Sequence, residues 1–130
     1  MTNDLWLNLP VKNLARSIAF YEAIGFERKL GPGNTASSAC FLVGDKKIVL
    51  MLFLDSVFSG FAGAPVGDTS QGAEVLISMG AQSREEVDAL AAKVRTGGGE
   101  VFAEPGGAGG GMYGCGVRDP DGHRWNFLHM

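Results

Sequence analysis

Two segments of the chain repeat apolar residues with a helical period, and capping residues bound the first of them on both sides. Leu14, Ile18 and Tyr21 follow one another at intervals of four and three residues. This spacing puts them on one face of a helix. Asn13 precedes the segment and Gly25 follows it, and these residue types commonly begin and end helices. The pattern predicts an amphipathic helix between them.

The same design returns in the second half of the chain. Ser83 and Glu86 form an S-x-x-E capping box in front of a second apolar stripe, which ends before Gly97. The stripe consists of Val87, Leu90, Ala91 and Val94. The two capping residues, Asn13 and Ser83, are 70 positions apart in a chain of 130 residues, close to the half-length offset that a tandem duplication requires. The sequence therefore predicts one structural plan used twice.

Strand-like runs flank both predicted helices. One run precedes each helix, a short run follows it, and two β-rich runs complete each half. The runs are Leu5–Val11, Phe26–Leu30, Ala39–Val43 and Lys47–Phe53 in the first half, and Glu74–Met79, Glu100–Ala103, Met112–Val117 and Arg124–Leu128 in the second. We therefore predict an α+β fold of two tandem β-α-β-β-β modules in a single domain spanning residues 1–130. Module 1 covers about 1–57 and module 2 about 72–130, with a linker at 55–72.

The glycine-rich segments predict turns and loops instead of a phosphate site. Gly97–Gly99 ends a predicted helix, whereas phosphate-binding loops precede one. Gly106–Gly111 lies between two predicted strands, and we expect a flexible loop over a cleft. The Asp-Pro-Asp-Gly sequence at 119–122 is typical of a turn, so we expect it to join the last two strands as a hairpin.

Composition and charge exclude several classes of function. Eleven basic and fourteen acidic residues give a net charge of −3 without a basic run, which argues against a nucleic-acid partner. The longest apolar run, Ile48–Leu54, has seven residues, whereas a membrane span needs about twenty. The acidic start, Met1–Asp4, does not resemble a signal peptide, so we expect a cytoplasmic protein. Cys40 and Cys115 are far apart in sequence, and we expect buried, reduced thiols.

The motifs of the chain resemble those of a known superfamily. The segment from Asn13 to Tyr21, followed by Gly25 and Phe26, and the closing Asp119–Trp125 are similar to the vicinal oxygen chelate superfamily. Its members include glyoxalase I, extradiol dioxygenases, fosfomycin-resistance enzymes and bleomycin-binding resistance proteins. The resemblance implies that each half curls into a partial barrel and that paired halves enclose a cleft, within one chain or across a homodimer.

Enzymes of this superfamily usually hold a divalent metal through His, Gln or Glu side chains, two from each half. By the resemblance, the four positions fall on Trp6, Met51, Glu74 and Asn126. The Trp6 indole has no lone pair for a metal, and the Met51 thioether and Asn126 amide are poor ligands for zinc, iron or magnesium. Glu74 is then the one strong ligand. We expect no metal cofactor, unless the ligand register differs from this assignment.

The resemblance directs five residues toward the cleft as a candidate site for a small molecule: Trp6, Asn8, Met51, Glu74 and Asn126. An alternative interpretation is that Trp6, Met51 and Asn126 merely fill a narrow barrel. The apolar segment around residues 57–61 could cover a partner subunit or its own cleft. The two histidines, His123 and His129, lie in the last hairpin and at the chain end, where local structural roles are expected.

Two functions follow from these residues. The first is metal-independent binding of an apolar or cationic small molecule, with Glu74 as the counter-charge; the bleomycin-binding relatives work in this way. The second is a metal-dependent lyase or isomerase similar to glyoxalase I, with Glu74 as a metal ligand or as the general base on a proton next to a carbonyl. The sequence does not name a substrate for either function.

Overall fold

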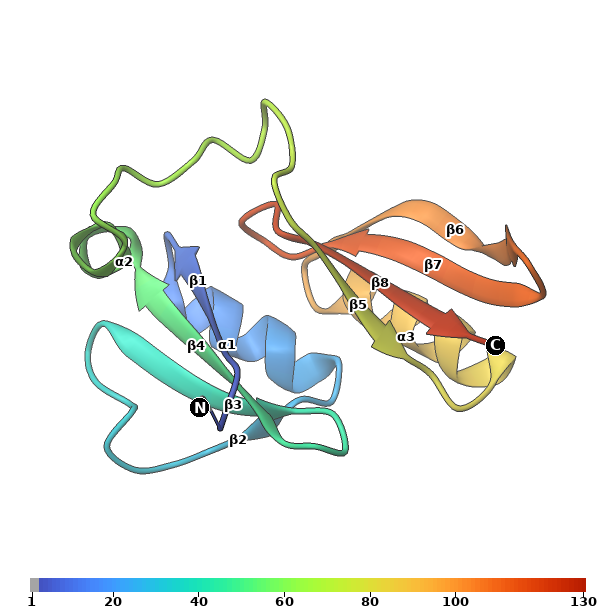
Figure 1. Cartoon of the computed structure of the whole chain (residues 1–130), viewed down its shortest axis with the longest axis horizontal. Coiled ribbons are helices and arrows are strands. Elements are labelled where there is room, and N and C mark those ends of the chain that lie inside the picture. The colour runs from blue at the N-terminus through green and yellow to red at the C-terminus, as the bar shows by residue number, and fades with distance from the viewer. Residues whose placement is uncertain (1–2) are drawn as a thin grey trace. The chain divides into compact units, whose positions relative to one another are not determined.

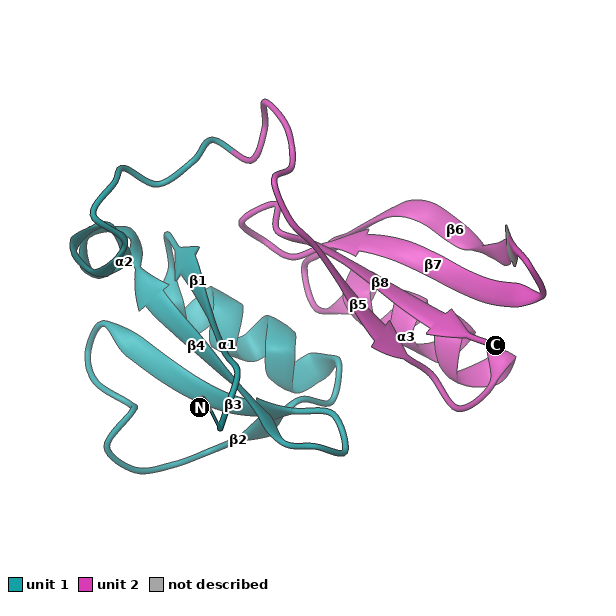
Figure 2. Cartoon of the chain, viewed as in Figure 1, with its two compact units in different colours: residues 1–68 teal, residues 69–130 magenta. Residues whose placement is uncertain are grey.

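The structure is a computed structural model that describes residues 3–130, apart from the side chain at position 108. The chain divides into two compact units, Met1–Asp68 and Thr69–Met130 (Figure 2). The first unit contains β1 (Trp6–Val11), α1 (Leu14–Ala23), β2 (Glu27–Arg28), β3 (Ser38–Val43), β4 (Ile48–Leu54) and α2 (Asp55–Ala62). The second contains β5 (Leu76–Gly80), α3 (Arg84–Thr96), β6 (Glu100–Gly109), β7 (Met112–Arg118) and β8 (Arg124–His129). The predicted β-α-β-β-β order is therefore present in both units.

Each unit is a four-stranded mixed sheet with a helix packed on one face (Figure 1). The strand order is β1-β4-β3-β2 in the first sheet and β5-β8-β7-β6 in the second. The first strand of each unit runs parallel to the last, and the other neighbours are antiparallel. Neither sheet closes into a barrel. The α+β prediction with two equivalent modules is confirmed.

The helices α1 and α3 begin at the predicted caps. The Asn13 side chain accepts a hydrogen bond from the backbone N–H of Arg16 at 3.0 Å, and the Ser83 hydroxyl accepts one from the N–H of Glu86 at 3.0 Å. The Glu86 carboxylate in turn accepts from the N–H of Gln82 at 3.0 Å. These bonds satisfy N–H groups that a helix start leaves without a partner, which is why local sequence was enough to locate both starts.

Each helix covers its own hydrophobic core. In the first unit, the Tyr21 ring contacts Phe20, Phe26 and Phe41, with centroids 5.0 to 5.9 Å apart. In the second unit, Val87, Ala91 and Val94 of α3 and Val117, Trp125 and Phe127 of the sheet are fully buried. Strand side chains alternate between faces, so in both units the sheet face away from the helix carries a different set of residues.

The glycine-rich segment 106–111 is part of a hairpin instead of a loop over a cleft. β6 continues to Gly109 and pairs with β7 through several register shifts. Gly109, Gly110 and Gly111 all have positive φ values of 84°, 57° and 82°, a conformation that is easy for glycine. The three glycines thus form the tight connection between β6 and β7.

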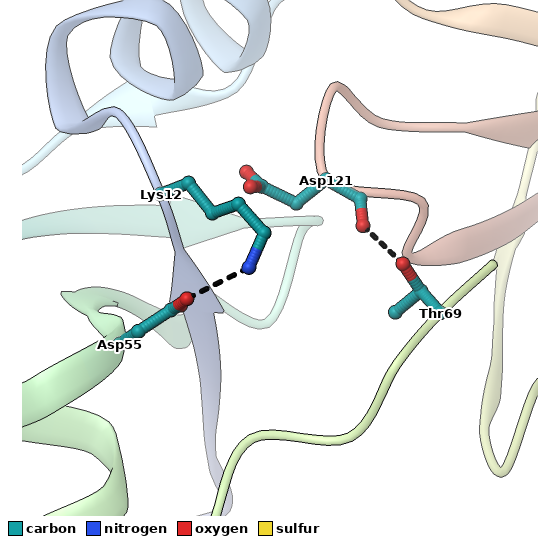
Figure 3. A network of polar contacts seen from close by, with 4 residues as sticks. All are labelled: Lys12, Asp55, Thr69 and Asp121. Carbon is teal, nitrogen blue, oxygen red and sulfur yellow. Dashed lines mark hydrogen bonds and ion pairs between the residues drawn. The ribbon is translucent and has the colours of Figure 1, made fainter.

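The Asp-Pro-Asp-Gly turn joins β7 to β8 as predicted. The Asp119 carboxylate accepts hydrogen bonds from the N–H groups of Asp121 and His123, at 3.0 and 2.9 Å. Gly122 has a φ of 87°. The Thr69 hydroxyl donates a hydrogen bond to the carbonyl of Asp121 (Figure 3), so the start of the second unit is fastened to this turn.

Helix α2 occupies the first part of the segment expected to be a linker. The residue before it, Leu54, supplies no capping side chain, and none of the helix residues is buried. The helix ends at Gly63, which is left-handed with a φ of 69°. It therefore lacks both the capping signal and the buried stripe that identified α1 and α3.

Both cysteines, Cys40 and Cys115, are buried and free, which confirms the prediction of buried thiols without a disulfide. Within residues 3–130, no helix has the length and apolar character needed to cross a membrane.

Candidate functional site

The first unit contains a cavity of about 740 Å³ that involves the open face of its sheet and the helix α2. This volume lies within the usual range for small-molecule sites, roughly 300–1,000 Å³. The cavity wall consists of Trp6, Asn8, Lys29, Leu30, Pro32, Gly33, Cys40, Val49, Met51, Phe53, Phe58, Phe61 and Ala62. The lining is mostly apolar, with four aromatic side chains and few polar ones.

A row of four side chains crosses the cavity from strand to strand. The register pairs Asn8 with Met51 and Met51 with Cys40. The N–H of Lys29 donates to the carbonyl of Cys40 at 3.0 Å, which extends the pairing of β2 and β3 by one residue. Opposite residues of neighbouring strands share one face of the sheet, and all four line the cavity. The row has Asn8 and Lys29 at its polar ends and sulfur-containing side chains between them.

The segment between β2 and β3 closes one side of the cavity, with Asn34 as its anchor. The Asn34 side chain accepts hydrogen bonds from Arg28 at 3.0 Å and from the N–H of Cys40 at 3.2 Å. It donates to the carbonyls of Lys29 at 2.8 Å and Gly31 at 3.3 Å. A side chain at Gly33 would place its Cβ 3.2 Å from that of Cys40, so this backbone lies directly against the cavity floor.

Helix α2 supplies the aromatic side of the cavity through Phe58 and Phe61. The Phe61 ring contacts the Phe53 ring at a centroid distance of 5.3 Å while 77% of its residue surface remains exposed. At the start of the helix, the Asp55 carboxylate forms an ion pair with the Lys12 ammonium at 2.9 Å (Figure 3). The helix is thus attached to its own unit at its first turn and near its end.

Three of the five predicted site residues lie together in this cavity: Trp6, Asn8 and Met51. Trp6 is 60% exposed, so it does not fill a closed barrel within its unit. The apolar segment 57–61, for which the sequence left two interpretations open, lines the cavity of its own unit through Phe58 and Phe61. A shared cleft that also includes Glu74 and Asn126 stays a prediction.

In the second unit, Glu74 precedes the first strand instead of belonging to it. β5 begins at Leu76, and Glu74 is exposed. Leu76 lies seven residues before the cap Ser83, as Trp6 lies seven before Asn13. The strand position equivalent to Trp6 is therefore held by Leu76, and the sequence-based register placed this position two residues too early in the chain.

Asn126 lies on β8, where the register pairs it with Ser78 of β5. This pair is the counterpart of Met51 and Asn8 in the first unit, because both join the first and last strands at the same point. The side-chain oxygen of Asn126 is buried and has no hydrogen-bond partner among the described residues. It is a neutral acceptor.

The donor set does not fit the divalent metal that the superfamily resemblance implies. With Leu76 in place of Glu74, the four positions that the resemblance assigns to metal ligands hold Trp6, Met51, Leu76 and Asn126, without an imidazole or a carboxylate. Transition-metal sites and magnesium sites are built from those stronger ligands. Across residues 3–130, no three side chains of His, Cys, Asp or Glu are grouped in a way that could hold a metal ion.

The remaining candidate groups have structural partners. The Nδ1 atom of His129 lies 3.0 Å from the carbonyl of Ala81, and the N–H of His123 belongs to the Asp119 turn. Burial raises the pKa of the Cys115 thiol above its ordinary value, and a protonated thiol is a poor nucleophile. These residues lie in the second unit; the bond given for His129 is made by its ring, and that for His123 by its backbone.

Sequence reasoning missed Lys29 as a wall residue of the first unit's cavity, and for Phe58 and Phe61 it left open whether they covered a partner or their own cleft. The apolar character of the segment around Phe58 was visible, but its helical form was not. Lys29 carried no signal, because its place in the cavity depends on the pairing of β2 with β3.

Comparison with known proteins shows the family of this chain. The family model described as Glyoxalase/Bleomycin resistance protein/Dioxygenase superfamily matches residues 5–127. The chain belongs to this superfamily. A hypothetical protein from S. aureus is similar in structure, with a TM-score of 0.86 and 33% identity over 100% of this chain and 95% of that one. No curated protein matches the sequence.

Other members of the superfamily share the fold at lower identity. A glyoxalase-related enzyme from Fulvimarina pelagi has a TM-score of 0.84 and 20% identity, covering 100% of this chain and 89% of that one. The fosfomycin resistance protein FosX from Listeria monocytogenes has a TM-score of 0.71 and 21% identity, covering 100% and 94%. These likenesses concern the glyoxalase/bleomycin-resistance fold, which is common to proteins of different activities.

Proposed function

We propose that this protein binds a small organic molecule in the cavity of its first unit, without a metal ion. The observation that carries the proposal is the cavity of about 740 Å³ with its apolar and aromatic wall. Such a wall with a few polar groups is the common form of a small-molecule site. Trp6 and Phe61, 60% and 77% exposed, would bury apolar surface on binding, which stabilises the complex.

The poor metal ligands at the four positions assigned by the resemblance support binding over metal-dependent lyase chemistry. Metal catalysis of this kind polarises a carbonyl or stabilises a developing negative charge, and the residues at the four assigned positions, Trp6, Met51, Leu76 and Asn126, do not hold a divalent ion strongly. The alternative role of Glu74 as a general base finds no support in its surroundings, because its side chain is exposed and lies before β5.

The proposal is tested with the full chain and N-phenyl-1-naphthylamine, an uncharged aromatic probe whose fluorescence rises in apolar sites. We expect saturable binding that is unchanged by excess EDTA, and elemental analysis should find far less than one Zn, Fe, Ni or Mn per chain after dialysis against these ions. The Gly33→Ala variant should bind the probe less tightly, because its new Cβ lies against Cys40 and Met51. Loss of probe binding with EDTA, or stoichiometric metal, would overturn the proposal.

A further inference from the structure

We infer that the ligand of the first unit's cavity is an aromatic acid, whose anionic group pairs with Lys29. This inference rests on the proposed function, because it names the ligand class of the same cavity. The structural basis is the charge of the cavity wall, the position of Lys29 in it, and the aromatic side chains that face the same space.

The cavity wall has one charged residue, Lys29, and no carboxylate. Two other lysines of this unit are paired, Lys12 with Asp55 at 2.9 Å and Lys47 with Glu27 at 2.7 Å, whereas Lys46 lies outside the cavity wall. Within residues 3–130, the Lys29 side chain has no ion pair or hydrogen bond. Lys29 is exposed at the rim of this apolar wall, and its ammonium group attracts an anion and repels a cation.

The sheet register puts Lys29 at one end of the row that crosses the cavity. Its neighbours in the row are Cys40 and Met51, and the far end is Asn8. With neighbouring strands about 4.8 Å apart, the backbones of Lys29 and Asn8 are separated by roughly 15 Å. The Asn8 amide has no hydrogen-bond partner among the described side chains. An elongated molecule can therefore place an acidic group at Lys29 and a polar group at Asn8.

The space between these polar ends is bordered by aromatic rings. Trp6 and Phe53 belong to the sheet, and Phe58 and Phe61 to α2. Aromatic side chains favour offset stacking or edge contacts with another ring. The wall thus matches an aromatic body, and Lys29 reverses the cationic preference that Glu74 had suggested from the sequence.

The test compares two probes that share one aromatic scaffold. 8-Anilinonaphthalene-1-sulfonate is N-phenyl-1-naphthylamine with an added sulfonate, so the pair isolates the effect of negative charge. Both are titrated against the parent chain, Lys29→Met, Lys29→Arg, and the control Lys46→Met. Lys46 is an exposed lysine in the turn between β3 and β4, outside the cavity wall. Circular dichroism and urea unfolding establish that the variants are folded.

We expect Lys29→Met to weaken binding of the anionic probe by up to about fivefold, the upper range for an ion pair of an exposed lysine, and to change the affinity for the uncharged probe by less than about twofold. Lys29→Arg and Lys46→Met should retain the affinity of the parent for both probes. Added salt should weaken only the anionic probe.

The outcomes separate the two proposals. Absence of saturable binding of the uncharged probe to the parent chain would overturn the proposed function. Saturable binding of both probes, with no selective loss of the anionic one in Lys29→Met, would overturn the aromatic-acid inference and leave binding in the cavity intact.

Discussion

At the scale of single residues, Asn34 is the anchor of the cavity wall. Its amide makes four hydrogen bonds, two of them accepted from Arg28 and the N–H of Cys40. The Nε atom of Arg28 is already buried without a partner among the described residues. We expect Asn34→Ala to lower the free energy of unfolding by about 1–3 kcal/mol, because it leaves the half-buried Arg28 guanidinium without this polar partner.

Urea denaturation measures this loss, and Asn34→Asp is the matched control. A carboxylate keeps both accepted bonds and adds an ion pair with Arg28, whereas it cannot donate to Lys29 and Gly31. We expect Asn34→Asp to lose less stability than Asn34→Ala. An Asn34→Ala variant as stable as the parent would show that the wall does not depend on this amide.

The Cys115 thiol gives the stability of the protein a pH dependence. Desolvation by burial is the main reason that its pKa is raised above 9.0. The folded chain therefore holds the thiol proton more firmly than the unfolded chain. This contribution to stability is complete below the unfolded pKa and is lost as the pH rises through the folded value. We expect the free energy of unfolding to fall as the pH is raised from 8 past about 9.

Urea unfolding across this pH range checks the effect, with Cys115→Ala as the comparison. The variant lacks the titrating group and should show a flatter curve, although it is less stable at every pH because it leaves a small cavity. The hydrogen bond to Asp88 raises the pKa of Tyr113 from 10.0 in the same direction, so its influence begins at higher pH. Equal slopes for the two proteins would contradict the assignment to Cys115.

At the scale of elements, the turn between β7 and β8 depends on Gly122. A Cβ at this position would lie 2.5 Å from the Thr69 hydroxyl oxygen, and the φ of 87° disfavours any side chain. We expect Gly122→Ala to destabilise the protein by about 1–3 kcal/mol. Thermal unfolding measures the loss, and Gly72→Ala is the control, because its Cβ would meet no atom within 4 Å.

A second background separates the two causes of that loss. In Thr69→Ala the clash with the hydroxyl is removed, so Gly122→Ala should cost less there, with the remaining loss due to backbone strain and to the Cβ of residue 69, 3.0 Å from the added Cβ. If the cost is the same in both backgrounds, contact with Thr69 does not contribute.

Elements with local signals could be predicted from the sequence, and α2 could not. Asn13 and Ser83 cap helices through side chains that are visible in the sequence, and both hydrogen bonds are present. α2 has no capping side chain and buries no residue, so its helical form leaves no periodic stripe to find. Its aromatic residues face a cavity and are not packed in a core. Sequence periodicity does not distinguish such a helix from an irregular linker.

At the scale of the whole molecule, the duplicated plan could be predicted from the sequence. The sequence did not indicate that the open sheet face carries a cavity in the first unit and is partly covered in the second. The cavity row joins residues far apart in sequence, such as Asn8 and Met51, and depends on strand register. A shift of two residues was enough to assign Glu74 to a position held by Leu76. In the second unit, the equivalent sheet face is partly covered by Phe102, whose ring would lie 2.6 Å from a Cβ added at Gly116.

From these differences we expect Phe102 to contribute mainly to the stability of its unit and Phe61 mainly to binding in the cavity. The Phe102 ring lies beneath the guanidinium groups of Arg118 and Arg124, at 5.6 and 4.5 Å from its centroid, and is 40% exposed. We expect Phe102→Ala to cost about 1–2 kcal/mol of stability, less than a fully buried phenylalanine. Its effect on binding of N-phenyl-1-naphthylamine should be negligible, because it lies outside the cavity wall.

Phe61→Ala should behave in the reverse way. The residue is 77% exposed, so its removal should cost less than about 1 kcal/mol of stability. Because it lines the cavity and contacts Phe53, probe affinity should fall about three- to tenfold. Urea unfolding and probe titration of the two variants check both halves of the prediction. If Phe102→Ala weakened the probe more than Phe61→Ala, binding would belong to the sheet face of the second unit, and the duplicated plan would have kept its ligand site there.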